Sequence, residues 1–135
     1  MALAVVLGLY WVSHVEGWSG MSRARAAVIL AAGQGTRMKS KTVKVLHPVG
    51  GRPMLDWAAQ LADDAGASKR VVVYGGHSPA VRDAGAALGA ETALQDPPQG
   101  TGHAVQAAET AFDDFEGDLI VLYADTPLIR AETVE

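Results

Sequence analysis

The chain has 135 residues, which at about 100–200 residues per domain leaves room for one domain. Hydrophobic residues make up 49% of the chain and charged residues 19%, a globular balance that excludes an intrinsically disordered chain and a collagen-like fibre. There is no cysteine, which excludes disulfide frameworks, thiolate metal sites and cysteine nucleophiles. We therefore expect a cytoplasmic protein.

The formal net charge is −4, but the charge is unevenly distributed along the chain. Between Gly17 and Leu55 there is no acidic residue, and the seven basic residues of this stretch are Arg23, Arg25, Arg37, Lys39, Lys41, Lys44 and Arg52. The stretch carries +7 and the rest of the chain therefore −11. A concentrated positive field favours a polyanionic ligand, although a solvated basic loop gives the same pattern. Because the total is acidic, we expect no nucleic-acid partner.

The first twenty residues differ in character from the rest. Residues 2–12 are almost wholly apolar, but they are too few to cross a bilayer, which takes about 20 residues. A secretory signal needs a positively charged start, which this segment lacks. Met21 begins a segment that resembles a natural start just before the first predicted strand. We predict that residues 1–20 are an extension outside the fold, without stable membrane insertion, and that the folded unit spans 21–135. The alternative is an apolar segment that packs on the domain or touches a membrane.

Four apolar runs predict buried strands, at residues 26–30, 70–74, 90–94 and 119–123. After the first strand we expect a long loop, rich in glycine and lysine, over residues 33–52. A helix then opens at Pro53 and ends at Gly66. A second helix is capped by Ser78 and stops at Gly89. The third helix begins at Thr101 or Gly102 and turns Val105, Ala108 and Phe112 inward.

Strands that alternate with helices predict an α/β fold with a mostly parallel sheet. In such sheets ligands bind outside the carboxyl ends of the strands. Four polar features follow those ends: the loop after Leu30, the Gly75–Gly76 turn, the loop at 95–102, and Asp125. We therefore expect the functional site at this edge of the sheet.

The segment LAAGQGTRM at residues 30–38 gives the strongest signal. Its small residues let the backbone close on a ligand and direct N–H groups at a phosphate or a base. Met38 stands where a dinucleotide-binding fingerprint needs its third glycine and where a P-loop needs the glycine before its lysine, so both motifs are excluded. A plain strand-to-loop turn is the alternative interpretation.

The segment KVLH at residues 44–47 gives the second signal. We expect Val45 and Leu46 to anchor the loop so that Lys44 points back to the site. Arg37 and Lys44 would then stabilise the negative charge of phosphoryl or nucleotidyl transfer. The alternative is that Lys44 is one of several solvent-facing lysines. His47 precedes a proline and is interpreted as a structural residue.

Two further positions carry polar chemistry. Asp125 follows a buried strand directly, which suits a Mg²⁺ ligand, although an aspartate that forms a turn is the alternative. Gln95 precedes the segment Gly100–Thr101, and its amide has both the donors and the acceptor needed to read a nucleobase edge; a flexible loop is the alternative. His77 and His103 lack the spacing of metal ligands and are predicted not to bind metal.

Together these segments resemble the sugar-phosphate nucleotidyltransferases, in particular the uridylyltransferase part of the bifunctional UDP-N-acetylglucosamine pyrophosphorylases. The resemblance runs from about Ala26 to the end of the chain and is carried by LAAGQGTRM (30–38), KVLH (44–47), GRPM (51–54), LQ (94–95), GTGHA (100–104) and LYADTPLI (122–129). It implies a Rossmann-like, mostly parallel sheet of the nucleotidyltransferase type, incomplete at Glu135. It also implies transfer of a uridylyl group from UTP to N-acetylglucosamine 1-phosphate with Mg²⁺ as cofactor.

The resemblance also implies a role for individual residues. Arg37 and Lys44 would bind and stabilise the triphosphate as catalytic residues, and Asp125 would bind Mg²⁺. The predicted contacts to the nucleotide and the sugar phosphate are Leu30, Ala31, Ala32 and Gly33 through the backbone, Gln95, Gly100 and Thr101 at the uracil, and Tyr123 and Ala124 near the sugar phosphate. Two residues depart from the family pattern: Val43 replaces a proline, and Ala124 replaces a glycine, where a methyl group would crowd the ligand.

The family's second metal-ligand region and its acetyltransferase repeat domain are not found in these residues. The resemblance therefore implies a longer parent chain that assembles as a trimer through that repeat domain, and one hypothesis is that the 135 residues are inactive alone. Two alternatives remain open at this point. One is a nucleotidyltransferase for another sugar 1-phosphate or for CTP, and the other is a non-catalytic nucleotide-binding module of the same fold.

Overall fold

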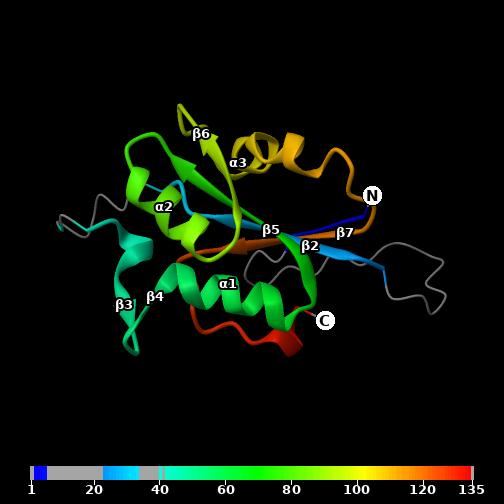
Figure 1. Cartoon of the computed structure of the whole chain (residues 1–135), viewed down its shortest axis with the longest axis horizontal. Coiled ribbons are helices and arrows are strands. Elements are labelled where there is room, and N and C mark those ends of the chain that lie inside the picture. Colours follow the sequence, from blue (N-terminus) through cyan, green and yellow to red (C-terminus); the bar gives the residue numbers. More distant parts are fainter. Residues whose placement is uncertain (1, 6–22, 34–39, 41, 135) are drawn as a thin grey trace.

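The computed structural model describes residues 2–5, 23–33, 40 and 42–134, and its core is a five-stranded sheet in the order β1-β7-β2-β5-β6 (Figure 1). The strands are β1 (Ala2–Val5), β2 (Arg25–Leu30), β5 (Ala67–Gly75), β6 (Glu91–Gln95) and β7 (Asp118–Tyr123). Every neighbouring pair in this sheet is parallel. The α/β class with a mostly parallel sheet, predicted from the alternation of strands and helices, is confirmed.

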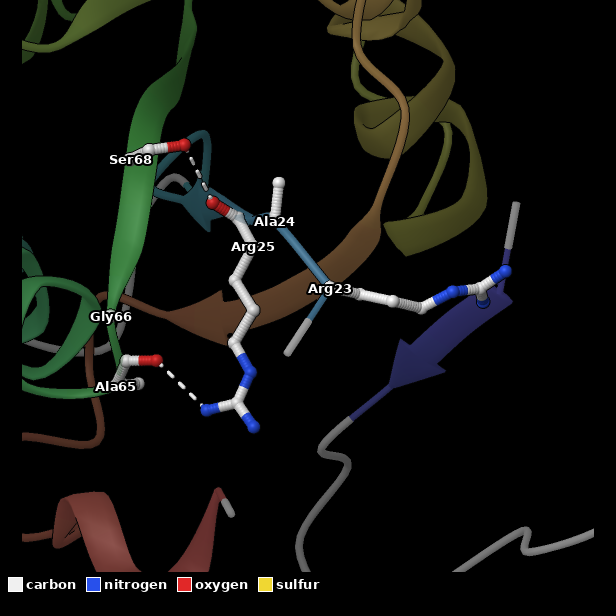
Figure 2. Close-up of a pocket in the computed structure, with 6 residues that line it drawn as sticks. All are labelled: Arg23, Ala24, Arg25, Ala65, Gly66 and Ser68. Atoms are coloured by element: carbon white, nitrogen blue, oxygen red, sulfur yellow. Dashed lines mark hydrogen bonds between the residues drawn. The ribbon is translucent and has the colours of Figure 1, made fainter. Parts of the chain in front are cut away.

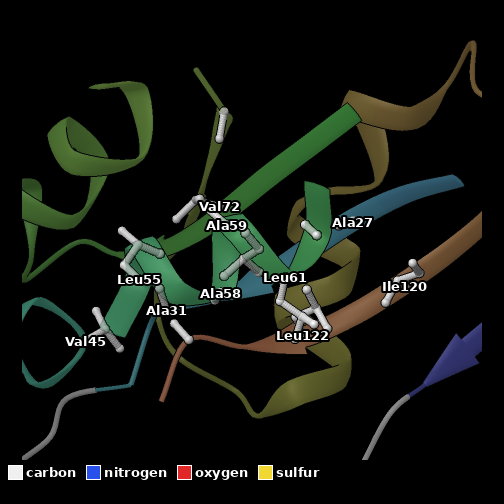
Figure 3. Close-up of a cluster of buried hydrophobic side chains, with 14 of the residues drawn as sticks. Ala27, Ala31, Val45, Leu55, Ala58, Ala59, Leu61, Val72, Ile120 and Leu122 are labelled. Atoms are coloured by element: carbon white, nitrogen blue, oxygen red, sulfur yellow. The ribbon is translucent and has the colours of Figure 1, made fainter. Parts of the chain in front are cut away.

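Helices cover both faces of the sheet, which explains why the central strands are apolar without interruption. The helices are α1 (Met54–Asp64), α2 (Pro79–Ala87) and α3 (Thr101–Ala107). Successive residues of a strand point to opposite faces. Accordingly Ala27 and Ile29 of β2 pack on the side of α1 and α2, whereas Ala26 and Val28 pack on the side of α3. Figure 3 shows the α1 side, where Leu55 is completely buried.

The predicted loop at 33–52 contains short regular elements where the structure describes it. A 3-10 turn, η2 (Lys44–Leu46), is followed by a small antiparallel hairpin of β3 (Pro48–Val49) and β4 (Arg52–Pro53). Trp57 of α1 donates a hydrogen bond of 2.8 Å from Nε1 to the Val49 carbonyl, and the Arg52 guanidinium lies 4.5 Å from the centre of the Trp57 ring. These contacts hold the hairpin against α1. Strands of two residues have no periodicity that a sequence pattern detects.

The amino-terminal segment differs from the prediction at four residues. Ala2–Val5 form β1, which pairs in parallel with β7 and extends the sheet at that edge. Without β1, β7 would be an edge strand, and the backbone groups of an edge strand can pair with a further segment. The apolar composition of residues 2–12 does not reveal this pairing. Residues 6–20 of the predicted extension lie outside the described residues, and the boundary at residue 21 stays a prediction. In the described part of the chain, no helix has the length and apolar character needed to span a membrane.

Two predicted helix features differ in detail. The third helix ends at Ala107, and a 3-10 turn, η3 (Glu109–Phe112), continues the chain and still buries Phe112. Ser78 is the N-cap residue of α2, as predicted, but its hydroxyl makes no capping hydrogen bond. Its Oγ is buried without a partner among the described residues. The Ser78 N–H donates instead to the Gly75 carbonyl over 2.9 Å, which closes the turn after β5 through the backbone.

Candidate functional site

A cavity of about 370 Å³ opens at the carboxyl ends of β2, β6 and β7, and we name it the carboxyl-edge cavity. It is lined by Leu30, Ala31, Ala32, Gly33, Lys44, Val45, Gln95, Pro98, Gly100, Thr101, Ala104, Tyr123 and Asp125. This is the edge at which parallel sheets bind ligands. Ten of these thirteen lining residues are among the contacts expected from the sequence, so residues far apart along the chain meet here.

Lys44 and Asp125 form the charged wall of the cavity. The Lys44 Nζ donates a hydrogen bond of 2.8 Å to the Asp125 Oδ2, although the two residues are 81 positions apart. The side chains are 39% and 38% exposed, so solvent screens this ion pair and it adds about 0–1 kcal/mol to stability. The pair therefore marks a meeting point of opposite charges rather than a structural brace.

The position of Lys44 follows from its neighbours, as the sequence predicts. Val45 is buried in the α1-side cluster together with Leu55 (Figure 3), and Leu46 packs against the same cluster. The His47 N–H donates to the Lys44 carbonyl over 3.1 Å, and the His47 ring lies 3.1 Å from the Thr42 carbonyl. His47 thus holds the turn, in agreement with its structural interpretation.

The backbone after β2 forms the floor of the cavity. The Ala31 N–H donates to the Val73 carbonyl over 2.8 Å, which continues the sheet ladder up to the cavity. Gly33 is exposed, and no described atom lies within 4 Å of the place that a side chain at this residue would occupy. Among the described residues, packing therefore does not require a glycine at position 33.

Gln95 lies at the end of β6 with its side chain enclosed. The residue is 3% exposed, and its Nε2 donates to the Gly100 carbonyl over 2.9 Å and lies 3.2 Å from the His103 Nδ1. Gly100 has φ +91° and ψ −179°, a backbone region that is essentially restricted to glycine. The amide nitrogen therefore contacts groups of the protein itself, and the contact of Gln95 with a nucleobase stays a prediction.

Thr101 of α3 and Tyr123 of β7 also line the cavity. The hydroxyls of Thr101 and Tyr123 lie 3.4 Å apart, and the Thr126 hydroxyl donates to the Tyr123 carbonyl over 2.9 Å. Tyr123 is only partly buried. Two cavity-lining residues from different elements therefore bring their hydroxyl groups together, and their contact with a ligand stays a prediction.

One predicted site residue is buried away from the cavity, and another lies outside the described residues. Ala124 is completely buried, its N–H donates to the Leu30 carbonyl over 3.1 Å, and its methyl group belongs to the α1-side cluster. The expectation that this methyl crowds the ligand is therefore wrong, because the side chain points into the core. Arg37 lies outside the described residues, and its role stays a prediction.

Three lining residues were not predicted: Val45, Pro98 and Ala104. Val45 was expected only as an anchor for Lys44. Ala104 follows Gly100 by one helical turn, so the predicted start of α3 was a signal that it faces the same space. Pro98 lies in a loop without periodicity, and no sequence pattern identifies which side of such a loop faces a ligand.

A second cavity, of about 410 Å³, lies at the opposite ends of the strands and is named the amino-edge cavity. It is lined by Arg23, Ala24, Arg25, Ala65, Gly66 and Ser68 (Figure 2). The Arg25 Nη1 donates to the Ala65 carbonyl over 3.0 Å, and the Ser68 hydroxyl donates to the Arg25 carbonyl over 3.1 Å. Arg23 lies 3.5 Å from the Asp118 carboxylate. The polar side chains of the amino-edge cavity therefore bind groups of the protein itself.

The carboxylate at the carboxyl-edge cavity fits one class of metal ion. Among the described residues no group of three or more His, Asp or Glu side chains is placed to hold an ion. Asp125 instead offers a single, partly exposed carboxylate with its Oδ2 beside Lys44. Mg²⁺ is commonly held by one or two carboxylates together with substrate phosphates and water. A lone aspartate beside an open cavity suits that mode of binding and does not suit an ion held entirely by protein groups.

Curated proteins are similar in sequence to most of this chain. The bifunctional protein GlmU of Maricaulis maris (strain MCS10) is 75% identical over 114 residues, which cover 84% of this chain and 25% of that protein. The GlmU protein of Caulobacter vibrioides (strain ATCC 19089 / CIP 103742 / CB 15) is 56% identical over 121 residues, covering 88% of this chain and 26% of that protein. The chain thus spans about a quarter of the length of the curated relatives it matches.

The fold is shared with solved structures. Rv0371c from Mycobacterium tuberculosis H37Rv has a TM-score of 0.69 at 24% identity, covering 85% of this chain and 59% of that chain. A complex of Rv0371c with manganese has a TM-score of 0.65 at 23% identity, covering 82% and 55%. Residues 27–135 match the family model of the MobA-like NTP transferase domain. The chain therefore belongs to the family of MobA-like NTP transferase domains.

Proposed function

We propose that this chain binds UTP in the carboxyl-edge cavity and carries catalytic residues for uridylyl transfer to N-acetylglucosamine 1-phosphate. The products are UDP-N-acetylglucosamine and pyrophosphate. The observation that carries the proposal is the meeting of Lys44 and Asp125 at 2.8 Å on the wall of this cavity. A family of NTP transferases supplies the reaction class, and the 75% identical relative named bifunctional protein GlmU supports the sugar nucleotide.

The nucleoside is assigned to the floor of the cavity. Residues 30–33 line the cavity, and the small side chains after Leu30 favour close approach of the uridine to the backbone. Gln95, Gly100 and Thr101 line the same cavity, and we assign the uracil ring to them. Tyr123, whose hydroxyl lies beside that of Thr101, is assigned to the sugar phosphate.

The transfer step is an in-line displacement. A phosphate oxygen of the sugar 1-phosphate attacks the α-phosphorus of UTP, a new P–O bond forms, and the bond from the α-phosphorus to the bridging oxygen breaks. Pyrophosphate leaves with the bond electrons, and no proton or covalent enzyme intermediate is needed. Lys44, with its ammonium group on the cavity wall, stabilises the charge of the triphosphate and of the leaving pyrophosphate. Arg37 is assigned the same task from the sequence resemblance.

Asp125 is the residue that would hold Mg²⁺. Its carboxylate is partly exposed on the cavity wall and fits an ion that also takes phosphate oxygens and water. When bound, the ion supplies charge neutralisation and orientation of the phosphates. Lys44 competes for the Oδ2 of Asp125 in the free protein, so a triphosphate that draws the ammonium group toward itself also frees this oxygen.

The transfer assay tests the proposal. The 135-residue chain is incubated with UTP, MgCl₂ and N-acetylglucosamine 1-phosphate, and UDP-N-acetylglucosamine is quantified by liquid chromatography. Lys44→Ala and Asp125→Ala are expected to abolish most of the product, whereas Arg25→Ala, at the amino-edge cavity, is the matched control. If Lys44→Ala and Asp125→Ala both keep full activity, the site assignment is wrong.

Calorimetry with UTP separates binding from transfer, because the chain spans a quarter of its relatives' length. Binding of UTP without product formation supports the nucleotide site and contradicts transfer by these residues alone. A panel of UTP, CTP and dTTP, combined with glucose 1-phosphate and N-acetylglucosamine 1-phosphate, decides the substrates. A preference for CTP or for glucose 1-phosphate contradicts the proposed pair of substrates.

A further inference from the structure

His103 contacts the side chain that we assign to the uracil. The His103 Nδ1 lies 3.2 Å from the Gln95 Nε2. The Gln95 Nε2 also donates a hydrogen bond of 2.9 Å to the Gly100 carbonyl. Gln95 is 3% exposed, and His103 is partly buried on the first turn of α3. The proposed mechanism gives His103 no task, so the contact calls for an explanation of its own.

The two acceptors determine which way the amide of Gln95 points. A glutamine amide has two N–H donors and one carbonyl oxygen. The Gly100 carbonyl only accepts, so the nitrogen must face it. The second N–H is satisfied by His103 when Nδ1 carries no proton and Nε2 does, because a neutral imidazole has one donor and one acceptor nitrogen. A turn of the amide by 180° would place its oxygen against both acceptors.

This arrangement leaves the amide oxygen as the part of Gln95 available to a ligand. No described residue donates a hydrogen bond to the Gln95 Oε1. In the described part of the chain, the one side-chain atom that is fully enclosed and unpaired is the Ser78 Oγ, so Oε1 is not fully enclosed. Gln95 lines the carboxyl-edge cavity. With both N–H groups directed at Gly100 and His103, the oxygen is the part of the amide left to meet a base in the cavity.

We propose that His103 is a positioning residue that fixes the amide of Gln95 with its oxygen toward the cavity and thereby makes the site select uracil over cytosine. This inference rests on the proposed function, because it assumes a pyrimidine nucleotide in the cavity. Uracil presents an N–H donor at N3, which pairs with the amide oxygen. Cytosine presents a lone pair at N3, which is repelled by that oxygen and would need an amide N–H instead.

The tautomer of His103 gives a test that does not depend on catalysis. A long-range ¹H–¹⁵N spectrum of the 135-residue chain, recorded at a pH at which the imidazole ring is neutral, reports which ring nitrogen carries the proton. The inference expects the proton on Nε2 of His103 and an unprotonated Nδ1. A proton on Nδ1 would overturn the inference, because that nitrogen could then not accept from Gln95.

Substitutions test the selectivity itself, measured as the ratio of the Kd values for CTP and UTP in MgCl₂. His103→Leu removes the acceptor and frees one N–H of Gln95, so the ratio is expected to fall about tenfold, the effect of one hydrogen bond. His103→Asn keeps an acceptor near the place of Nδ1 and is expected to retain the ratio. His103→Gln carries its amide farther out and is expected to lose the ratio as His103→Leu does. Circular dichroism melts check that each variant folds.

His77→Leu is the matched control, because His77 is an exposed histidine of the same sheet edge without a hydrogen bond to Gln95. It is expected to leave the ratio unchanged. If wild type prefers UTP and His103→Leu keeps that preference, the role of His103 is refuted while the proposed function stands. If wild type binds no UTP, the proposed function fails and the inference fails with it. Should His103→Leu not fold, the contrast between the Asn and Gln variants decides.

Discussion

The two cavities of the molecule have similar volumes and different chemistry. The amino-edge cavity measures about 410 Å³ and the carboxyl-edge cavity about 370 Å³. β2 has six residues, so at about 3.3 Å per residue its two ends lie about 17 Å apart. In the amino-edge cavity, Arg23 and Arg25 pair with a carboxylate and a carbonyl of the protein and point in different directions (Figure 2). In the carboxyl-edge cavity, opposite charges meet at an open wall.

The difference shows that neither cavity size nor positive charge identifies the site. The amino-edge cavity is of similar volume and contains two arginines, yet its polar groups serve the packing of the strand ends. At the carboxyl edge, by contrast, the elements leave the sheet in different directions and their polar groups converge on a shared space. This is the general property of parallel sheets that places ligands there.

The sharpest contrast between the cavities is expected in catalysis. Lys44→Met removes a charge of the carboxyl-edge cavity while keeping an unbranched side chain, and we expect kcat/KM for UDP-N-acetylglucosamine formation to fall on the order of 100-fold to 1000-fold. Arg25→Met removes a charge from the amino-edge cavity and is expected to leave kcat/KM within about twofold. Steady-state kinetics measure both. Equal losses in the two variants would contradict the assignment.

Two glycines give the next largest contrast, because both have a positive φ and each lines one of the cavities. Gly100 has φ +91° and Gly66 has φ +78°, so alanine at either position is expected to strain the backbone by about 1–3 kcal/mol. Gly100→Ala should also displace the carbonyl that orients Gln95 and weaken UTP binding about tenfold or more. Gly66→Ala should lower the unfolding free energy and leave UTP affinity unchanged. Urea unfolding and calorimetry separate the two effects.

Arg25 tests the view that the amino-edge cavity is structural. Arg25→Met removes the hydrogen bond to the Ala65 carbonyl, and we expect the free energy of unfolding to fall by about 0.5–1.5 kcal/mol. The Kd for UTP should not change. A weakened UTP affinity at unchanged stability would show that this cavity takes part in nucleotide binding.

The smallest effect is expected for the contribution of the Lys44–Asp125 ion pair to the free energy of unfolding. A double-mutant cycle with Lys44→Met and Asp125→Asn should give a coupling of about 0–1 kcal/mol in the free energy of unfolding, because both groups are over one third exposed. The same cycle measured on kcat/KM should show large losses. A coupling of several kcal/mol in stability would mean that the pair is a structural brace.

The sheet was predictable because it depends on local patterns, whereas most of the cavity-lining residues were implied only by the family resemblance. The apolar run at 26–30 became a strand at Arg25–Leu30, since a strand buried on both faces has a continuous apolar sequence. Asp125 was found because it directly follows β7, and Lys44 because two apolar neighbours anchor it. The parallel topology then brought these residues to one edge without further information.

The remaining features depend on contacts that local patterns do not contain. The Gln95 nitrogen faces inward because of Gly100 and His103, which lie beyond the end of β6. Ala124 points into the α1-side cluster because of its register at the end of β7. The pairing of β1 with β7 joins segments more than a hundred residues apart. Each of these is a tertiary relation, which a local sequence pattern does not contain.

A paramagnetic titration tests the central claim most directly. The ¹⁵N-labelled chain is titrated with UTP in the presence of Mn²⁺ in place of Mg²⁺, and the broadening of the backbone amide signals is compared at the two edges of the sheet. The account predicts strong broadening for the amides of Lys44 and Asp125 and little for those of Arg25 and Ser68. Broadening at Arg25 and Ser68 with sharp signals at Lys44 and Asp125 would contradict it.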